Sequence, residues 1–203
     1  MPYIRLLLGR ELKAYLENGL DELQSCESWR GRFFSQLHPD AGLGCHPLHV
    51  TLLAELHEQL GKQLQTGIQA ALSAPVWHSE VTIQPLRWNI TRPAADGWSS
   101  VQLLIRGGGP GDAIAKLCAA LKARVPQGRE FKARKGARHI TCGVFKGNPT
   151  DRDALLCELA QKIPMAADRR WLCDALQFET DRPDTLPNDK PVPLQTLDAL
   201  WHE

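Results

Sequence analysis

Apolar positions follow two spacings along this chain, one typical of helices and the other of strands. Over residues 10–24 they recur every three or four positions, which predicts an amphipathic helix. The same spacing predicts helices over residues 55–73, about 112–125, and from a cap at Thr150 or Asp151 to Ile163. Short or alternating apolar runs predict strands over residues 3–8, 47–53, 80–90, 98–106, 139–145 and 170–179.

These elements follow the order strand, helix, strand, helix, strand, and the order then occurs a second time. Strands that alternate with helices are typical of a parallel α/β sheet. The repetition favours another interpretation, in which two copies of one α+β half each carry a histidine-bearing strand in the middle. Such a duplication would place the two related strands face to face across a cleft. We expect a long loop over residues 25–46, a break in the third strand after Pro85, and a turn at Gly107–Gly111.

Length and charge narrow the possible classes of protein. The 203 residues suit one domain, or two small lobes that share a core. We therefore expect one bilobal domain over residues 1–180, a Pro-rich tail over residues 181–203 that lies on the surface, and a monomer. The formal net charge of +1 gives no global signal for binding a polyanion, so any contact with nucleic acid requires a local basic patch.

Cysteine usage and the lack of long apolar runs favour the cytoplasm. None of the six cysteines forms a C-x-x-C pair, and no stretch approaches the roughly 20 apolar residues of a membrane helix. The apolar run Ile4–Leu8 is too short for the core of a signal peptide. We expect reduced thiols and a cytoplasmic protein without membrane contact.

Two matching motifs carry the candidate chemistry. The chain contains His49-Val50-Thr51-Leu52 and His139-Ile140-Thr141-Cys142, both of the form His–apolar–Thr–apolar and both on predicted strands. Because side chains alternate along a strand, each histidine shares a face with its threonine, while the residue between them points into the core. One imidazole can act as base and the other, as imidazolium, as acid. The hydroxyls can hold the oxygens of a phosphate.

These paired motifs, about ninety residues apart, resemble the 2H phosphoesterase superfamily, and in particular its LigT-like branch of 2′-5′ RNA ligases and 2′,3′-cyclic phosphodiesterases. The resemblance extends from Tyr3 to about Thr180, and outside the motifs it rests on the order of the elements. It implies a duplicated, two-lobed α+β fold, with antiparallel sheets facing a central cleft and helices outside. It also implies a catalytic pair, His49 and His139, and phosphate-binding threonines, Thr51 and Thr141, with no cofactor.

Residues near the second motif are candidates for contact with a substrate. The stretch 122–138 is basic and leads into His139, so it can attract the phosphates of RNA or of a nucleotide. The candidates are Lys132, Arg134, Lys135, Phe131 as a stacking residue, and Tyr3. Arg138 should point away from the histidine face if the strand has already begun. For Phe34, Trp88 and Trp98 we favour packing over stacking on a base.

Several alternatives stay open. Cys45, His46 and His49 have the spacing of metal ligands, but no second cluster completes a zinc site, so we expect no metal. The leading hypothesis is hydrolysis of a 2′,3′-cyclic phosphate of a nucleotide or an RNA terminus. The alternatives are cleavage of 2′-5′ or 3′-5′ linked oligonucleotides, 2′-5′ ligation of RNA, and a non-enzymatic RNA-binding module.

Overall fold

A computed structural model of the chain describes residues 3–36, 48–53, 81–106, 114–115, 117–119, 138–166, 168–179 and 192–193. Two predicted elements lie outside these residues, namely the helix over residues 55–73 and the turn at Gly107–Gly111. Of the predicted helix over residues 112–125, the described residues 114–115 and 117–119 are helical. Six candidate residues named above also lie outside the described residues, namely Cys45, His46, Phe131, Lys132, Arg134 and Lys135.

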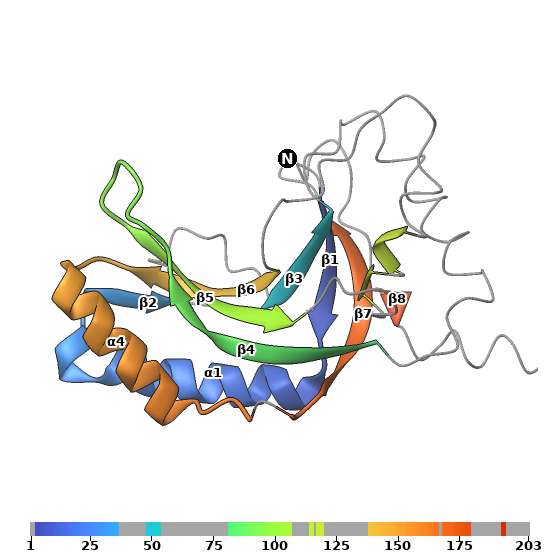
Figure 1. Cartoon of the computed structure of the whole chain (residues 1–203), viewed down its shortest axis with the longest axis horizontal. Helices are drawn as coiled ribbons and strands as arrows, with labels where there is room; N and C mark the ends of the chain where they lie inside the picture. The colour runs from blue at the N-terminus through green and yellow to red at the C-terminus, as the bar shows by residue number, and fades with distance from the viewer. Residues whose placement is uncertain are drawn as a thin grey trace, which may run out of the picture.

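The predicted strands and the two predicted helices that the structure describes in full are present (Figure 1). The strands are β1 (Tyr3–Leu8), β2 (Phe33–Ser35), β3 (His49–Leu53), β4 (Thr82–Ile90), β5 (Ser99–Arg106), β6 (His139–Phe145), β7 (Trp171–Glu179) and β8 (Val192–Pro193). The helices are α1 (Arg10–Ser25), the short 3-10 helix η1 (Glu27–Trp29) and α4 (Pro149–Lys162).

Three local details differ from the sequence-based expectation or refine it. Strand β2 and helix η1 lie within the segment expected to be a loop, because both are too short to show a periodic pattern. Helix α4 is capped by Asn148, whose side chain accepts a hydrogen bond from the backbone N–H of Asp151, so the expected caps were wrong. The expected break in β4 is a change of register between Pro85 and Arg87.

All the pairings among the described strands are antiparallel, so the parallel α/β alternative does not apply to them. The order β1-β3-β6-β5-β4-β7 returns to β1 through a further pairing, which closes the strands into a circuit. Strand β2 pairs with β6 at the edge, and β8, from the expected tail, pairs with β7. We call β1, β3 and β7 the first lobe, and β2, β4, β5 and β6 the second lobe (Figure 1).

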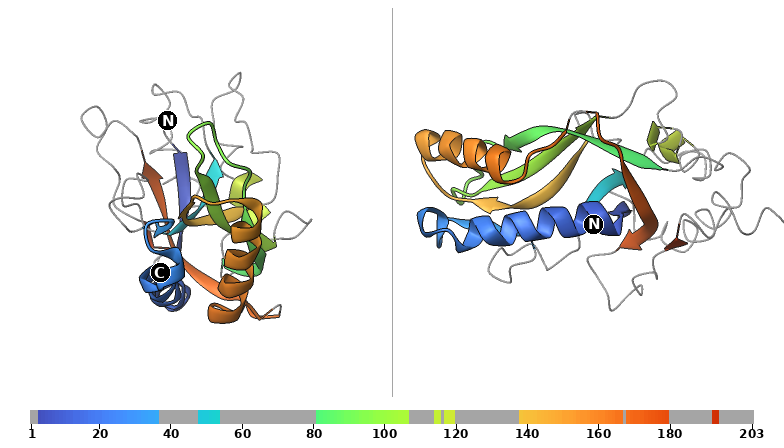
Figure 2. Two further views of the ribbon diagram at one scale, coloured as in Figure 1. Left: turned by 90° about the vertical axis from the view of Figure 1, so that its left-hand side faces the viewer. Right: turned by 90° about the horizontal axis from the view of Figure 1, so that it is seen from below.

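One row of buried side chains crosses the circuit from lobe to lobe. Leu6 pairs with Val50, Val50 with Ile140, and Ile140 with Leu103, and all four side chains have no exposed surface. Helices α1 and α4 lie on the same side of the strands (Figures 1 and 2). They contribute Leu12, Leu16, Leu20, Leu23, Leu155 and Leu159 to the same core. The residues that alternate with the buried row therefore face the opposite side.

Gly143 permits β2 to approach β6 beside the second motif. A Cβ at this position would lie 2.3 Å from the carbonyl oxygen of Phe34, which is too close for any side chain. The backbone N–H of Gln36 also donates to the carbonyl of Cys142 over 2.9 Å. The register between β5 and β6 shifts at this point, so Cys142 is the extra residue of a bulge.

We expect Gly143→Ala to detach β2 and to destabilise the protein by about 1–3 kcal/mol, because the added methyl group forces two backbones apart. Thermal denaturation would measure the stability, and hydrogen exchange at the amides of Ser35 and Gln36 would measure the local opening. Asn148→Ala is the control, since loss of the helix cap should cost about 1 kcal/mol without opening β2. Unchanged exchange in β2 of the Gly143→Ala variant would contradict this account.

Candidate active site

The two His-x-Thr motifs lie on neighbouring strands at the junction of the lobes. The motif strands β3 and β6 pair with each other in the sheet, so the expectation that these two strands face each other across a cleft was wrong. Val50 of β3 pairs with Ile140 of β6 in antiparallel register. Carrying this register one residue to each side sets His49 opposite Thr141 and Thr51 opposite His139. Because Val50 and Ile140 point into the core, these four side chains share the other face, and all four are half-buried.

The register determines the spacing of the four groups. Directly opposite residues of an antiparallel pair have Cβ atoms about 4.5–5.5 Å apart, and diagonal ones are roughly 7 Å apart. The histidines are the diagonal pair, and so are the threonines. Each imidazole is thus adjacent to one hydroxyl along its own strand and to another across the pair. A phosphate that accepts a hydrogen bond of about 2.8 Å from each imidazole can occupy the space between them.

Different residues flank the motif pair on its two sides. On the side of the first lobe, Arg5 of β1 pairs with Thr51 and Leu7 pairs with His49. On the side of the second lobe, Gln102 of β5 pairs with Thr141, and Leu104 pairs with His139. Paired residues point to the same face of a sheet, so all of these side chains border the site. Arg5 and Gln102 are therefore candidate site residues that the sequence-based prediction missed.

Arg5 is the flanking residue with a recognisable sequence signal. It is a single charge inside the apolar run from Ile4 to Leu8, and its side chain is only 4% exposed. An arginine is almost never so deeply buried unless its guanidinium has partners. A charged residue in an otherwise apolar strand is therefore a sign of a polar site on that strand. Gln102 gives no comparable signal, because a polar residue on an alternating strand is ordinary.

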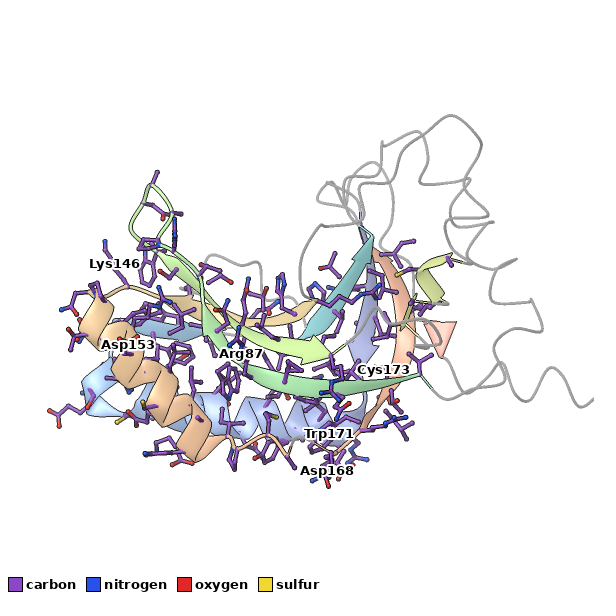
Figure 3. The ribbon with its side chains drawn as sticks, viewed as in Figure 1. Arg87, Lys146, Asp153, Asp168, Trp171 and Cys173 are labelled. Atoms are coloured by element: carbon purple, nitrogen blue, oxygen red, sulfur yellow. The ribbon has the colours of Figure 1, made fainter. Side chains whose placement is uncertain are left out.

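A second line of residues continues the face across β4. Asn89 pairs with Gln102, and its side-chain N–H donates to the side-chain amide oxygen of Gln102 over 3.3 Å. Arg87 pairs with Leu104 and is exposed. Figure 3 labels Arg87 near the middle of the strands. The face therefore presents amides near one end of the motif pair and a cation near the other.

Comparison with known proteins shows which of them share this fold. No protein-family model and no curated protein matches the chain. Usb1 of Kluyveromyces marxianus, solved with uridine monophosphate, matches 95% of this chain and 97% of its own, with 13% identity and a TM-score of 0.53. A second structure of the same protein gives a TM-score of 0.51 at 13% identity over the same shares.

Escherichia coli LigT complexed with NADP+ is a more distant match. It covers 94% of this chain and 93% of its own, with 18% identity and a TM-score of 0.43. Usb1 and LigT are both 2H phosphoesterases. The Usb1 structures decide the fold. This chain has the 2H phosphoesterase fold. The duplicated, two-lobed α+β architecture implied by the motifs is therefore confirmed.

The other residues that were considered for substrate contact can also be placed in this 2H fold. Tyr3 is the first residue of β1 and pairs with Glu179. Arg138 points away from the histidine face, as expected, because its guanidinium donates to the sulfur of the buried Cys118. Trp88 packs in the core and donates from its indole N–H to the carbonyl of Ile163. Phe34 and Trp98 are only half-buried.

The described residues contain no group of three or more His, Cys, Asp or Glu side chains able to hold a metal ion. Helices in the described part of the chain lack the combination of length and apolar character that a membrane span requires. All five cysteines that the structure describes are free thiols.

Two buried thiols lie on strands, one of them within the second motif. Burial raises the pKa of Cys142 to about 12, from an ordinary value of 9.0. Burial, with a smaller effect of the neighbouring Asp174 carboxylate, raises the pKa of Cys173 to about 12 as well. Both thiols are therefore protonated at neutral pH and inert to reagents that require a thiolate. Cys157 lies exposed on α4.

We expect iodoacetamide at about pH 8.5 to modify Cys157 in the folded protein, and to modify Cys142 and Cys173 only after unfolding. Peptide mass spectrometry would locate the modified thiols. Because the folded pKa values lie above 9.0, these thiols contribute full stability below about pH 9, and the contribution falls as the pH rises toward 12. Rapid alkylation of Cys142 in the folded chain would contradict this assignment.

Proposed function

We propose that this chain is a metal-independent phosphodiesterase that hydrolyses the 2′,3′-cyclic phosphate of a nucleotide or an RNA terminus. The observation that carries the proposal is the pairing of Val50 with Ile140, which gives both motifs one common face. Two imidazoles and two hydroxyls on one face suffice for a phosphoryl transfer in which side chains move the protons. Usb1, solved with uridine monophosphate, supports a nucleotide as the ligand.

Hydrolysis requires one proton to be removed and another to be supplied. The neutral imidazole accepts a proton from water as the water oxygen bonds to phosphorus. The imidazolium protonates the ribose oxygen as its bond to phosphorus breaks. His49 and His139 have these two roles, and proton exchange with solvent restores their starting states. Thr51 and Thr141 donate hydrogen bonds to the non-bridging oxygens, where charge gathers in the transition state.

Positive charge beside the motifs supports an anionic substrate. Arg5 lies next to Thr51 and is held close to the sheet by its burial, while Arg87 borders the opposite flank beyond Leu104. The basic stretch before His139 would extend this charge along a longer RNA. Its members Lys132, Arg134 and Lys135 are proposed to contact phosphates, and Phe131 and Tyr3 are proposed as further contacts with the substrate.

The same four motif residues also suit cleavage of 2′-5′ or 3′-5′ linked oligonucleotides, and 2′-5′ ligation as the reverse reaction. These reactions share the acid–base pair and differ in the groups bound on either side of the phosphorus. An RNA-binding module would keep the polar face and lack turnover. Assays with each substrate in turn separate these alternatives from the proposal.

We expect His49→Ala and His139→Ala each to lower kcat for a nucleoside 2′,3′-cyclic phosphate by about 10²–10⁴-fold, because each removes one proton transfer. Chromatography of the monophosphate product, with excess chelator present, would measure the rate and identify the isomer. Leu172→Ala, at an exposed position on β7, is the control and should retain the full rate.

Two outcomes would contradict the acid–base assignment. One is a near-normal rate in either histidine variant whose thermal unfolding matches that of the parent chain. The other is loss of activity in chelator with recovery on adding a divalent metal. Absence of turnover on cyclic phosphates, with His-dependent cleavage of a 2′-5′ linked dinucleotide, would move the substrate to the oligonucleotide class. Binding without any turnover would favour the RNA-binding module.

We expect Thr51→Val and Thr141→Val to lower kcat/KM by roughly 10–10³-fold, because each removes one hydrogen-bond donor while the side chain keeps its size. Thr51→Ser and Thr141→Ser, which retain the hydroxyl, should recover most of the loss. Steady-state kinetics on the same cyclic nucleotide would measure both pairs of variants. Equal losses in the Val and Ser variants would show that shape, and not the hydroxyl, is what matters.

A further inference from the structure

The face that carries the motifs continues, within the second lobe, to a pair of partly exposed aromatic side chains. Phe34 of β2 pairs with Val144 of β6, and its ring centroid lies 5.7 Å from that of Trp98. The two ring planes are inclined by 52°. Val144 also pairs with Ser100 of β5, which shares a face with Gln102, and Trp98, which immediately precedes β5, contacts Phe34 on this face. The aromatic pair therefore lies on the motif face of the sheet.

Between this pair and the motifs lie groups that can form hydrogen bonds. Gln102 is directly opposite Thr141, and it is joined to Asn89 through their side-chain amides. The amide N–H groups of Gln102 and the amide oxygen of Asn89 are not used in that bond. One donor and one acceptor are the complement that the edge of a nucleobase requires. Lys146 completes the outer end, with its ammonium 5.8 Å from the centroid of Trp98.

The separation of these groups fits a nucleoside. Because Cys142 is the extra residue of a bulge, Thr141 and Val144 lie opposite Gln102 and Ser100, which are two residues apart on β5. The distance along the strand is therefore about 7 Å, and β2 lies a further 4.8 Å or so to the side. The aromatic pair thus begins about 8 Å from the phosphate-binding threonine. In a nucleoside 2′,3′-cyclic phosphate, four bonds of about 1.5 Å join phosphorus to the base, so the ring centre lies roughly 6 Å from phosphorus.

The opposite flank of the motifs has a different composition. There Leu7 lies opposite His49, and Ala175 of β7 lies opposite Leu7, and neither side chain can stack on a base or hydrogen-bond to its edge. Arg5, opposite Thr51, provides a buried cation on this flank. The two motifs are nearly alike, but the contacting rings of Phe34 and Trp98 and the joined amides of Asn89 and Gln102 border the second one.

We infer that the base of the reacting nucleotide binds in the second lobe, against Phe34 and Trp98, with its edge at Gln102 and Asn89. The inference rests on the proposed function and adds to it the place and the chemistry of base recognition. Phe34 and Trp98 supply stacking, which every base accepts, and the amides distinguish one base from another. Lys146 at the rim attracts the next phosphate when the substrate is an RNA end.

The test compares substrates with and without a base. Uridine 2′,3′-cyclic phosphate and adenosine 2′,3′-cyclic phosphate carry the base, and methyl riboside 2′,3′-cyclic phosphate carries the same reacting group without it. Loss of one stacking residue should raise KM for the nucleotides about 5–100-fold and leave kcat within about threefold. The base-free substrate should react equally well, within about twofold, in Trp98→Ala and in the parent chain.

The variants separate stacking from folding. Trp98→Phe keeps an aromatic ring and should recover most of the affinity, while Phe34→Leu removes the ring and keeps an apolar side chain. Leu172→Ala is the matched control for removing an exposed apolar side chain. Its neighbours in the chain, Trp171 and Cys173, lie well away from Lys146 in Figure 3. A loss that is equal for nucleotides and for the base-free substrate, or no loss for either, would overturn the inference.

Binding in the absence of turnover distinguishes failure of this inference from failure of the proposed function. Calorimetric titration of uridine monophosphate into the His49→Ala chain, with and without Trp98→Ala, measures the base contact alone. Weaker binding in the double variant supports the inference even if the parent chain hydrolyses no cyclic phosphate. Equal binding in both chains, with His-dependent hydrolysis in the parent, would overturn the inference and leave the proposed function standing.

Discussion

The buried row from Leu6 through Val50 and Ile140 to Leu103 is the constraint on which the candidate site depends. Side chains alternate along a strand, so a slip of one residue in any of these strands would exchange its two faces. Val50 and Ile140 would then face water, and imidazoles and hydroxyls would enter an apolar core at a cost of several kcal/mol. Packing of residues that take no part in chemistry therefore keeps the reactive groups on one face.

The motifs specify their own faces but not their neighbours. The pattern of His49-Val50-Thr51 is enough to predict which side chains point outward, because alternation is a property of one strand. The partners Arg5 and Gln102 depend on the registers of β1 with β3 and of β5 with β6, which are set by packing between distant segments. The candidate reactive groups could therefore be predicted from the sequence, whereas the residues that border them were missed.

The fold shows the same division between local and distant causes. The long periodic segments that the structure describes in full were predicted within one or two residues, because each carries enough apolar positions to define its period. Strand β2 has three residues and is held by Gly143, whose missing side chain admits it, so its cause lies more than a hundred residues away in the chain. The cap of α4 was misplaced by two or three residues because Asn148, Thr150 and Asp151 are all acceptable caps.

The two similar motifs have different neighbours, and this difference affects which phosphate isomer the proposed reaction would form. Along β6, Thr141 is nearer to β2 than His139 is, and the register sets His49 opposite Thr141. A base held at Phe34 and Trp98 would direct the ribose 2′-oxygen, which is adjacent to the base-bearing carbon, toward His49. The 3′-oxygen would then lie toward His139, which as the acid would release it and leave the phosphate on the 2′-oxygen. In this arrangement the base contact, and not any difference between the histidines, assigns the acid and the base and determines the isomer that is formed.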